Sequence, residues 1–330
     1  MLKAIIFNMD GVLINRMPEQ EGYIPVPGIK PLLENLHKNN IRLAATSFTS
    51  SREIEKIIKS LELQKYFDKL VSGSQLTKPL PAPDLFLIAL EKLGVNPKET
   101  LVVEASQNGI AAAYTAGITS VGFYNLHSGD QPLDKAAVVV GSFEGLDTMF
   151  FENILRRSQG EPVIIANTRR LLIRELAEND IEDMYQIYQD PQIRKYIDNI
   201  DDYKEAEKNK LRAYIKNVYS FYGYGLWGVF SKTSHKLIGR CGIENQVIDD
   251  REEIMLSYLL DSQHWGYGYA LECCKAVLLY AREELGIERV VAVIDKNNIR
   301  SIHTAQKLGM SPEKELVYQN HDSILYVKEI

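Results

Sequence analysis

A glycine-rich turn at residues 263–270 has the residue types and the surroundings of a site for an anionic phosphate group. It follows a strand-like segment at 253–260 and opens a helical segment near 268–285, and Gly266 and Gly268 stand at its centre. Glycine lets successive backbone N–H groups approach a ligand, and a helix N-terminus adds about half a positive charge. We therefore predict that this turn binds a pyrophosphate.

The segments around this turn resemble the GNAT acetyltransferases. The turn is similar to the Q/R-x-x-G-x-G/A loop with which that family binds the pyrophosphate of coenzyme A, and the resemblance covers about residues 168–328. It extends to the branch that includes ribosomal-protein and spermidine N-acetyltransferases. The likeness is carried by residues 168–175, 237–243, 298–301 and 307–310. It implies direct transfer of an acetyl group from acetyl-CoA to a primary amine of a small molecule or a peptide N-terminus.

The same resemblance assigns roles to individual residues. In the family, the strand before the loop, here 254–260, splays from the strand at 289–294, and the pantetheine arm enters the gap. There Asn298 would contact the pantetheine and Ser301 the phosphate region, although Asn298 is also a natural helix N-cap and Ser301 a first-turn residue. The expected acetyl-CoA contacts are Ser257, Tyr258, Leu259, Leu260, Gln263, His264, Trp265, Gly266, Tyr267, Gly268, Tyr269, Ala270, Asn298 and Ser301.

Acetyl transfer needs an unprotonated amine, because a protonated amine has no lone pair, and a group that protonates or tolerates the departing thiolate. A thiol pKa near 8.5 makes the second demand mild. Glu244 and Glu253 lie at or near strand ends beside the expected cleft, and we predict them as candidate bases acting through water. Tyr318 is the candidate general acid. The alternatives are a solvated strand-end carboxylate for Glu244 and a packed aromatic ring for Tyr318.

Residues 7–13, Phe-Asn-Met-Asp-Gly-Val-Leu, resemble the opening motif of the haloacid dehalogenase (HAD) superfamily. The likeness to its β-phosphoglucomutase-like branch extends from residue 1 to about 125. That family uses an aspartate nucleophile, a second aspartate two residues on, a Ser/Thr and a lysine for the phosphate oxygens, and acidic residues for Mg²⁺. The matching positions here are Asn8, Asp10, Thr46, Leu80, Glu104 and Ala105.

Three of these positions lack the side chain that the family chemistry needs. Asn8 is an amide, which is a poor nucleophile and carries no charge for Mg²⁺. Leu80 occupies the lysine position, with Lys78 two residues away as a substitute, and Ala105 replaces a magnesium carboxylate. We predict that this half has no phosphatase activity and holds no Mg²⁺ or other metal.

The stretch between Leu13 and Pro27 is too short for the helical cap domain that selects substrates in relatives. A capless, inactive domain is expected to have a scaffold or regulatory role. The alternative is that Asp10, Thr46 and the loop amides still bind a phosphorylated ligand.

The elements that must position these residues change in type near the middle of the chain. Up to about residue 125, short apolar runs alternate with amphipathic helical stretches, which predicts βαβ units and a parallel sheet with helices on both faces. Later, strand-like segments at 225–231, 236–243 and 253–260 follow one another through short turns, as in an antiparallel meander. We predict an α/β HAD-like Rossmannoid domain over 1–150, a linker over 151–166, and an α+β GNAT domain with a mixed, mostly antiparallel sheet over 167–330.

Composition excludes several classes of protein. The chain of 330 residues favours two domains, and its 38 Lys and Arg against 44 Asp and Glu, a net charge of −6, provide no positive field for nucleic acid. Cys241, Cys273 and Cys274 show no spacing of a disulfide framework or zinc site, which fits a reducing cytoplasm. No apolar run approaches the roughly 18 residues of a membrane span. We expect a cytoplasmic protein with no nucleic-acid or membrane partner, and homodimerisation is left open.

Three functions remain in competition from the sequence. The first is an acetyl-CoA-dependent N-acetyltransferase joined to a pseudo-phosphatase. The second is a non-catalytic sensor that binds coenzyme A and a phosphorylated metabolite, and the third is a residual HAD phosphatase. Steady thiol release with an amine would favour the first over the second, and magnesium-dependent hydrolysis of p-nitrophenyl phosphate would favour the third.

Overall fold

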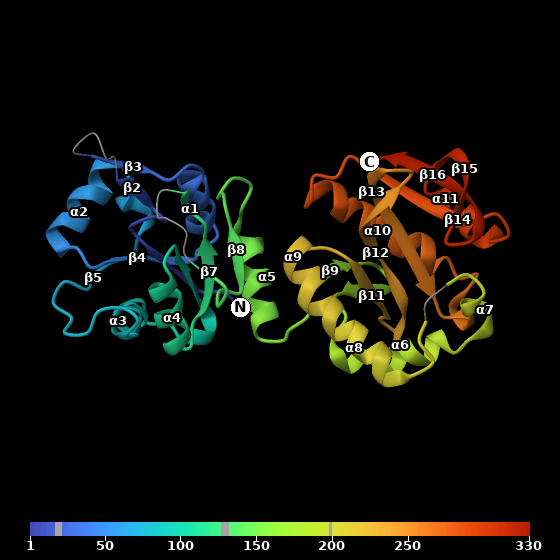
Figure 1. Ribbon diagram of the computed structural model, residues 1–330, viewed down its shortest axis with the longest axis horizontal. Coiled ribbons are helices and arrows are strands. Elements are labelled where there is room, and N and C mark those ends of the chain that lie inside the picture. Colours follow the sequence, from blue (N-terminus) through green and yellow to red (C-terminus); the bar gives the residue numbers. More distant parts are fainter. Residues whose placement is uncertain (17–21, 127–131, 198–199) are drawn as a thin grey trace. The chain divides into compact units, whose positions relative to one another are not determined.

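The computed structural model describes residues 1–16, 22–126, 132–197 and 200–330. The chain forms two compact units, Met1–Glu161 and Pro162–Ile330 (Figure 1). No helix in these described ranges is both long and apolar enough to cross a membrane.

The first unit is built on a six-stranded sheet whose neighbouring strands are all parallel, in the order β5-β4-β1-β6-β7-β8. A parallel sheet with intervening helices is the predicted α/β architecture. The strands are β1 (Ala4–Asn8), β4 (Arg42–Ser47), β5 (Lys69–Ser72), β6 (Thr100–Glu104), β7 (Thr119–Phe123) and β8 (Val138–Val140), and a small separate hairpin contains β2 (Ile14–Arg16) and β3 (Tyr23–Pro25).

Helices cover both faces of this sheet, because side chains along a strand alternate between the faces. Ile5 and Phe7 of β1 belong to the core beneath α1 (Ile29–Lys38), α2 (Ser51–Ser60) and α5 (Thr148–Ser158). Ala4 and Ile6 belong to the opposite core, beneath α3 (Asp84–Leu93) and α4 (Gln107–Thr115). Short 3₁₀ turns are η1 (Gln64–Tyr66) and η2 (Pro97–Glu99).

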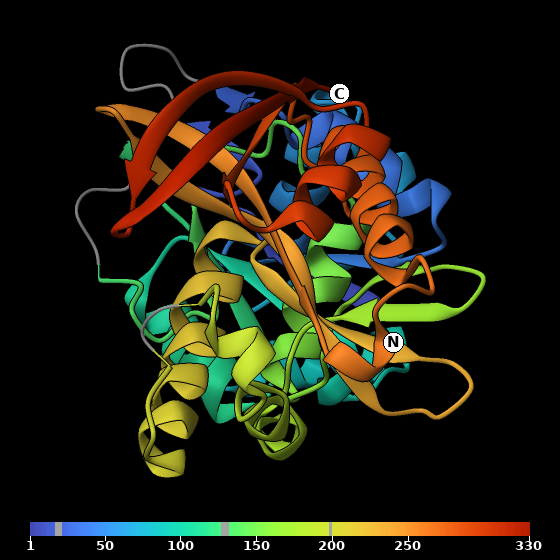
Figure 2. The same ribbon diagram turned by 90° about the vertical axis from the view of Figure 1, so that its right-hand side faces the viewer.

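The second unit has an eight-stranded sheet in the order β15-β16-β14-β13-β12-β11-β10-β9. Its neighbouring strands are antiparallel except for β13 and β14, so the sheet is mixed as predicted. The β15–β16 hairpin, in red in Figure 2, is long and strongly curved. The strands are β9 (Ile164–Asn167), β10 (Leu171–Arg174), β11 (Leu226–Ser231), β12 (Leu237–Ile248), β13 (Arg251–Leu260), β14 (Arg289–Asp295), β15 (Ser311–Tyr318) and β16 (His321–Glu329).

The helix α10 (Tyr269–Glu283) belongs to the main apolar core of this unit and packs there with Trp227 and Ile243 of the sheet. A second apolar cluster joins α6 (Ile181–Tyr188) to Phe230 and Leu259. The remaining helical elements are η4 (Glu178–Asp180), α7 (Pro191–Arg194), α8 (Lys204–Tyr214), the π-helical η5 (Ile215–Tyr219), α9 (Ser220–Tyr222), η6 (Ser262–His264) and α11 (Ile299–Lys307).

The linker predicted over 151–166 does not exist as an extended connection. Residues up to Ser158 complete α5, which begins after Asp147, whose side chain accepts a hydrogen bond from the Phe150 N–H. Residues from Ile164 form β9, so only a short turn joins the two elements. The polar residues Arg156, Arg157 and Ser158 end an amphipathic helix whose apolar side, including Phe151, is buried, and 159–163 form the short connection to β9.

The strand β15 was also not predicted. Its residues alternate between exposed and half-buried positions, and charged side chains dominate it, so no apolar run marks it. It lies at the edge of the sheet and, among the described strands, pairs with β16 alone. Tyr318 is therefore the last residue of an edge strand.

Candidate functional site

The turn between β13 and α10 presents a row of backbone donors without partners. Gly266 and Gly268 have φ of 83° and 78°, a conformation that favours glycine, and a Cβ added at Gly266 would meet nothing within 4 Å. In the part of the chain that the structure describes, the six backbone N–H groups from Gly266 to Leu271 have no acceptor. Three of them belong to the first turn of α10, so the helix dipole adds to their attraction for an anion.

The three residues before this row use their N–H groups within the turn itself. The Gln263 N–H donates to Asp261 Oδ1 at 3.1 Å, and the His264 N–H donates to the Asp261 carbonyl at 2.9 Å. The Trp265 N–H donates to the Ser262 carbonyl at 3.2 Å. The predicted anion-binding stretch 263–270 is therefore divided, because its first three amides shape the turn and only the later ones are open.

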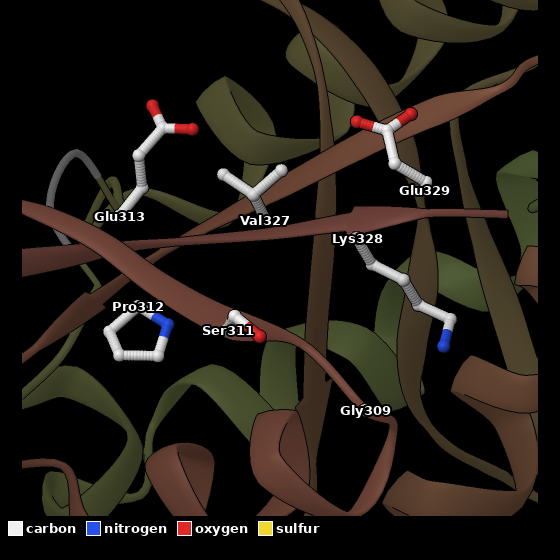
Figure 3. Close-up of a pocket in the computed structure, with 7 residues that line it drawn as sticks. All are labelled: Gly309, Ser311, Pro312, Glu313, Val327, Lys328 and Glu329. Atoms are coloured by element: carbon white, nitrogen blue, oxygen red, sulfur yellow. The ribbon is translucent and has the colours of Figure 1, made fainter.

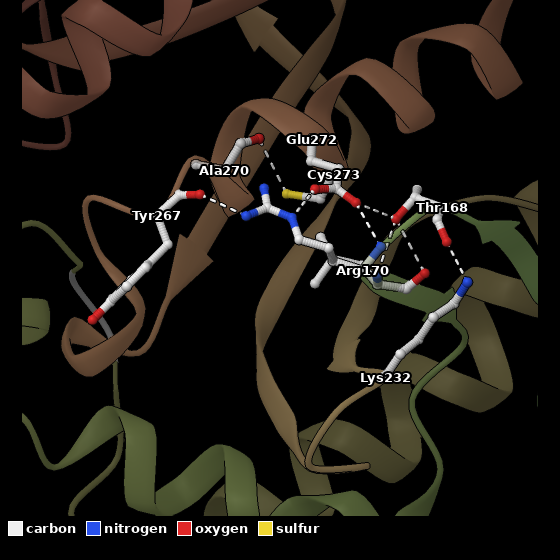
Figure 4. Close-up of polar contacts among 8 residues, drawn as sticks. Thr168, Arg170, Lys232, Tyr267, Ala270, Glu272 and Cys273 are labelled. Atoms are coloured by element: carbon white, nitrogen blue, oxygen red, sulfur yellow. Dashed lines mark hydrogen bonds and ion pairs between the residues drawn. The ribbon is translucent and has the colours of Figure 1, made fainter.

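Arg170, which directly precedes β10, holds this turn in place (Figure 4). Its Nε donates to Glu272 Oε2 at 2.6 Å and its Nη1 to the Tyr267 carbonyl at 2.9 Å, while its guanidinium lies 4.4 Å from the centre of the Tyr269 ring. Burial would raise the pKa of Glu272, but hydrogen bonds from Thr168 and Arg170 outweigh it and lower that pKa. Glu272 therefore stays ionised and ties Arg170 to the first turn of α10.

The strands β13 and β14 separate beside the turn. They are paired only at Met255 and Val291 in the described chain, so the segment of β13 beyond Met255 has no ladder on that side. The Asp261 N–H donates to Ile238 of β12. Because backbone groups alternate along a strand, Leu259 and Ser257 also face β12.

The four predicted backbone contacts on β13 are therefore reduced to Tyr258 and Leu260, which face the open side. Of these, the Leu260 carbonyl already accepts a hydrogen bond from Trp265 Nε1 at 2.8 Å. The Tyr258 hydroxyl donates to the Ser301 carbonyl at 3.2 Å, which ties β13 to α11. Backbone groups of Tyr258 and the Leu260 N–H are left for a ligand in the gap.

Asn298 and Ser301 have the structural roles that the sequence left open. The Asn298 side chain caps α11, because its Oδ1 accepts a hydrogen bond from the Ser301 N–H at 3.2 Å. A pantetheine contact would have to use the side-chain amide of Asn298, since its oxygen is engaged in the cap.

Glu244 lies on β12 and is held by a tyrosine. Its Oε1 accepts a hydrogen bond from the Tyr214 hydroxyl at 2.9 Å, and the same hydroxyl accepts one from the Leu226 N–H at 2.7 Å. Burial and the charge of Glu244 raise the pKa of Tyr214, so this hydroxyl stays a donor. Within the described residues, Oε2 of Glu244 has no partner and is free to accept a proton.

Glu253 and Tyr318, the other two candidate catalytic residues, are each engaged by a partner. Both oxygens of Glu253 are engaged by Arg289, at 3.2 and 3.3 Å, so this carboxylate serves a salt bridge between β13 and β14. The Tyr318 hydroxyl donates to Gln246 Oε1 at 3.4 Å. Burial and the charge of Glu244 raise the pKa of Tyr318, which places Tyr318 within the electrostatic reach of Glu244.

A shallow concavity at the β15–β16 hairpin contains none of the predicted site residues (Figure 3). Glu313 and Glu329 both pair with Arg289, at 3.2 and 3.5 Å, and Lys328 Nζ donates to the Leu308 carbonyl. Its charged groups thus have partners within the protein, and we do not assign it a ligand.

In the first unit, the positions that match the HAD site gather at the carboxyl ends of β1, β4 and β6. Asn8 Nδ2 donates to the Asp10 carbonyl at 3.1 Å, and Asp10 Oδ2 accepts from Ser47 Oγ at 3.2 Å. The Thr46 hydroxyl donates to the Phe7 carbonyl at 3.3 Å. These polar groups are directed at one another and at the backbone.

Glu104 is only 1% exposed in this cluster. Burial raises its pKa to about 7, against hydrogen bonds from Ser106 and Asn8 that lower it. The Ser106 N–H and hydroxyl both bind Glu104 Oε2 at 3.0 Å. A Cβ added at Gly109 of α4 would lie 2.1 Å from the Glu104 carboxyl carbon, so a glycine is required there.

The remaining positions supply no charge to this cluster. Leu80 packs against the apolar core below α3, and Lys78 is exposed. Ala105 is buried, and its side chain has no atom that could bind a metal ion. The residues present therefore fit a magnesium ion poorly, since Asn8 and Ala105 are not carboxylates.

Sequence reasoning missed Arg170, Glu272 and Tyr214, which position the other groups. Arg170 lies within the stretch 168–175 that carries the family likeness, but that likeness gives it no role, and its partner Glu272 is 102 residues away in the chain. Tyr214 ends α8, where the chain passes into the π-helical turn η5. The nearest signal in the sequence is the aromatic run that begins at Tyr219, and Tyr214 itself stands outside that run.

Comparison with known proteins agrees with this division of the chain. The model of the family described as "Acetyltransferase (GNAT) domain" matches residues 170–311, and that described as "Haloacid dehalogenase-like hydrolase" matches residues 16–123. The second match begins after the motif that contains Asn8 and Asp10.

Individual relatives each cover one unit. A phosphorylated carbohydrates phosphatase of Thermotoga maritima is 35% identical over 116 residues, 34% of this chain and 54% of that protein, so this chain spans about half of its length. The N-acetyltransferase p20 of Bacillus licheniformis is 26% identical over 147 residues, 44% of this chain and 82% of that protein.

Among solved structures, a putative ribosomal-protein-serine acetyltransferase from Vibrio cholerae has a TM-score of 0.43 and 21% identity. It aligns with 51% of this chain and 98% of its own. Both family models agree with the two sheets described above. The chain thus contains a haloacid dehalogenase-like domain followed by a GNAT acetyltransferase domain.

Proposed function

We propose that the second unit transfers an acetyl group from acetyl-CoA to a primary amine on a small molecule or a peptide N-terminus. The observation that carries this proposal is the row of unpartnered N–H groups from Gly266 to Leu271 beside the separated strands β13 and β14. The row suits the pyrophosphate of coenzyme A, and the gap suits an extended arm with amide groups.

In the proposed reaction, the amine nitrogen attacks the thioester carbon, the C–S bond breaks, and the amide product and coenzyme A thiol leave. Glu244 takes the proton that the amine loses, directly or through a water, with its free Oε2. We assign Tyr318 as the group that donates a proton to the leaving thiolate, since a tyrosine hydroxyl is protonated at neutral pH. The Tyr258 N–H faces the gap, where it stabilises the oxyanion of the tetrahedral intermediate.

Calorimetric titration of the full chain with acetyl-CoA tests the binding step. Gly266→Ala should weaken binding about tenfold, because the side chain disfavours the positive φ that aims the N–H groups. Gly286→Ala is the matched control, since Gly286 also has positive φ, 64°, and no atom within 4 Å of an added Cβ. Equal affinities for the two variants, or no binding by the wild type, would refute this loop as the site.

The reaction itself is tested by thiol release from acetyl-CoA with polyamines, aminoglycosides, amino acids and basic N-terminal peptides. Turnover with one class identifies the acceptor. Binding of acetyl-CoA without thiol release on any of these would favour the sensor function over the transferase.

For the first unit we propose a scaffold or regulatory role without phosphatase activity, although its relatives include proteins named as phosphatases. The support is chemical: the nucleophile position is the amide of Asn8, the lysine position is Leu80, and a magnesium ligand is replaced by Ala105. Magnesium-dependent phosphate release by the wild-type chain would contradict this assignment.

A further inference from the structure

All three cysteines of the chain meet at one place inside the second unit. Cys241 lies on β12, and Cys273 and Cys274 lie in the second turn of α10. Each is 0% exposed, and the three sulfur atoms all lie within 4.8 Å of one another. Since the chain contains only these cysteines, every thiol that it has is directed to this one cluster.

The spacing of the sulfur atoms suits shared coordination of one ion. Cys241 Sγ lies 3.7 Å from Cys274 Sγ. Two sulfurs bound to one ion at about 2.3 Å are about 3.8 Å apart in a tetrahedral site and about 4.0 Å apart in a trigonal one. Small rotations about the Cys273 side chain would bring the third sulfur to the same ion.

The composition of the cluster decides which ion it suits. No His, Asp or Glu of the described residues joins the three thiols, so oxygen and nitrogen ligands are lacking. Thiolate ligands select soft cations such as Cu(I) and Zn²⁺, but structural Zn²⁺ sites have four protein ligands. A site with three sulfurs and no fourth protein ligand favours the ion of lower coordination number.

We propose that Cys241, Cys273 and Cys274 form a binding site for a single Cu(I) ion. Binding requires that thiols become thiolates, so each thiol that ionises releases one proton, and no change of oxidation state is involved. Affinity therefore falls as the pH falls.

Cu(I) at this site acts on the helix that carries the open amides. Cys273 Sγ donates to the Ala270 carbonyl at 3.2 Å, and this bond is lost when the thiol becomes a ligand. Ala270 belongs to the first turn of α10, whose N–H groups form the proposed pyrophosphate site. Copper should therefore alter acetyl-CoA affinity without any contact between the two ligands.

The experiment uses the full chain, reduced and free of oxygen, titrated against a chromophoric Cu(I) chelator. We expect one copper per chain to be removed from the chelator. Cys241→Ala and Cys274→Ala should each weaken retention at least about 100-fold. Val277→Ala is the matched control, because it opens a cavity in the same buried core of α10 without removing a thiol and should retain copper.

Three outcomes would overturn the proposal. One is wild-type protein that leaves all copper with the chelator, a result that needs no variant to fold. Another is undiminished copper binding by Cys241→Ala, which would place the ion elsewhere. The third is stoichiometric retention of Zn²⁺ in place of Cu(I). A rise in melting temperature with copper, seen for the wild type and Val277→Ala alone, supports the site independently of acetyl-CoA binding.

Discussion

Both units place polar groups where a strand meets a helix, but the groups differ in whether they have hydrogen-bond partners within the chain. In the first unit, the groups around Asn8, Asp10 and Glu104 have partners within the chain. In the second, the amides from Gly266 to Leu271 have no partner among the residues that the structure describes. Unpartnered groups at a surface turn are available to a ligand, whereas internally bonded ones must break those bonds first.

This contrast predicts its largest effect in the activities of the wild-type chain. With a suitable amine, acetyl-CoA should release thiol steadily, while p-nitrophenyl phosphate with Mg²⁺ should release phosphate only at the rate of a blank. Asn8→Asp alone should remain at the blank rate, because Leu80 and Ala105 still lack the charges that the phosphate and Mg²⁺ need. If the wild type releases phosphate and Asp10→Asn abolishes that release, the first unit is an active phosphatase and the comparison fails.

Glu244→Gln tests the free carboxylate oxygen of the second unit. Removal of a general base should lower kcat by about 10²- to 10⁴-fold, with little change in the affinity for acetyl-CoA. Glu253→Gln is the matched control, because both oxygens of Glu253 are already bound by Arg289, and its kcat should change less than about threefold. Steady-state kinetics with the acceptor found above would measure both, and equal losses would show that neither acts as the base.

Glu104→Gln tests the buried carboxyl group of the first unit through the pH dependence of the free energy of unfolding. Because burial raises the folded-state pKa to about 7 from 4.5, the folded unit holds this proton more tightly than the unfolded chain. Protonation of Glu104 therefore adds to the free energy of unfolding. This contribution, up to about 3 kcal/mol, is fully present below pH 4.5 and is lost as the pH rises through 7.

The glutamine variant, which stays neutral, should remove that pH dependence and be more stable than the wild type at pH 8. Urea titrations at pH 5 and pH 8, followed by hydrogen exchange in peptides of the first unit, would measure it. Parallel pH profiles for the two proteins would mean that Glu104 is ionised in the folded state at pH 5.

Arg170→Ala tests whether the turn between β13 and α10 must be held in one conformation to bind acetyl-CoA. Loss of the bonds to Glu272 and the Tyr267 carbonyl should weaken acetyl-CoA binding by about tenfold or less, because the amides are no longer held in one orientation. Arg174→Ala is the control, since Arg174, at the other end of β10, forms a salt bridge with Asp180 and its described partners do not include the turn. Calorimetry of both variants separates the effect on the turn from a general loss of stability.

Much of the fold was predictable because its signals are local. Alternating apolar runs and amphipathic helices identified β1, β4, β6 and β7, and the short turns identified the antiparallel part of the second sheet. The strand β15 and the helix α5 were missed for physical reasons. The first is a charged edge strand with no apolar face of its own, and the second ends in polar residues typical of a linker.

The sequence by itself determined the two domain classes, the glycine turn and the loss of charge at Asn8, Leu80 and Ala105, because these depend on residue type and short spacing. Only the tertiary structure decided which groups are free. Glu253 is neutralised by Arg289, Glu244 is held by Tyr214, and Cys241 meets Cys273 and Cys274. Such partners come from separate strands and helices, and a hydrogen bond, salt bridge or sulfur contact depends on distances of a few ångströms that spacing in the chain does not encode.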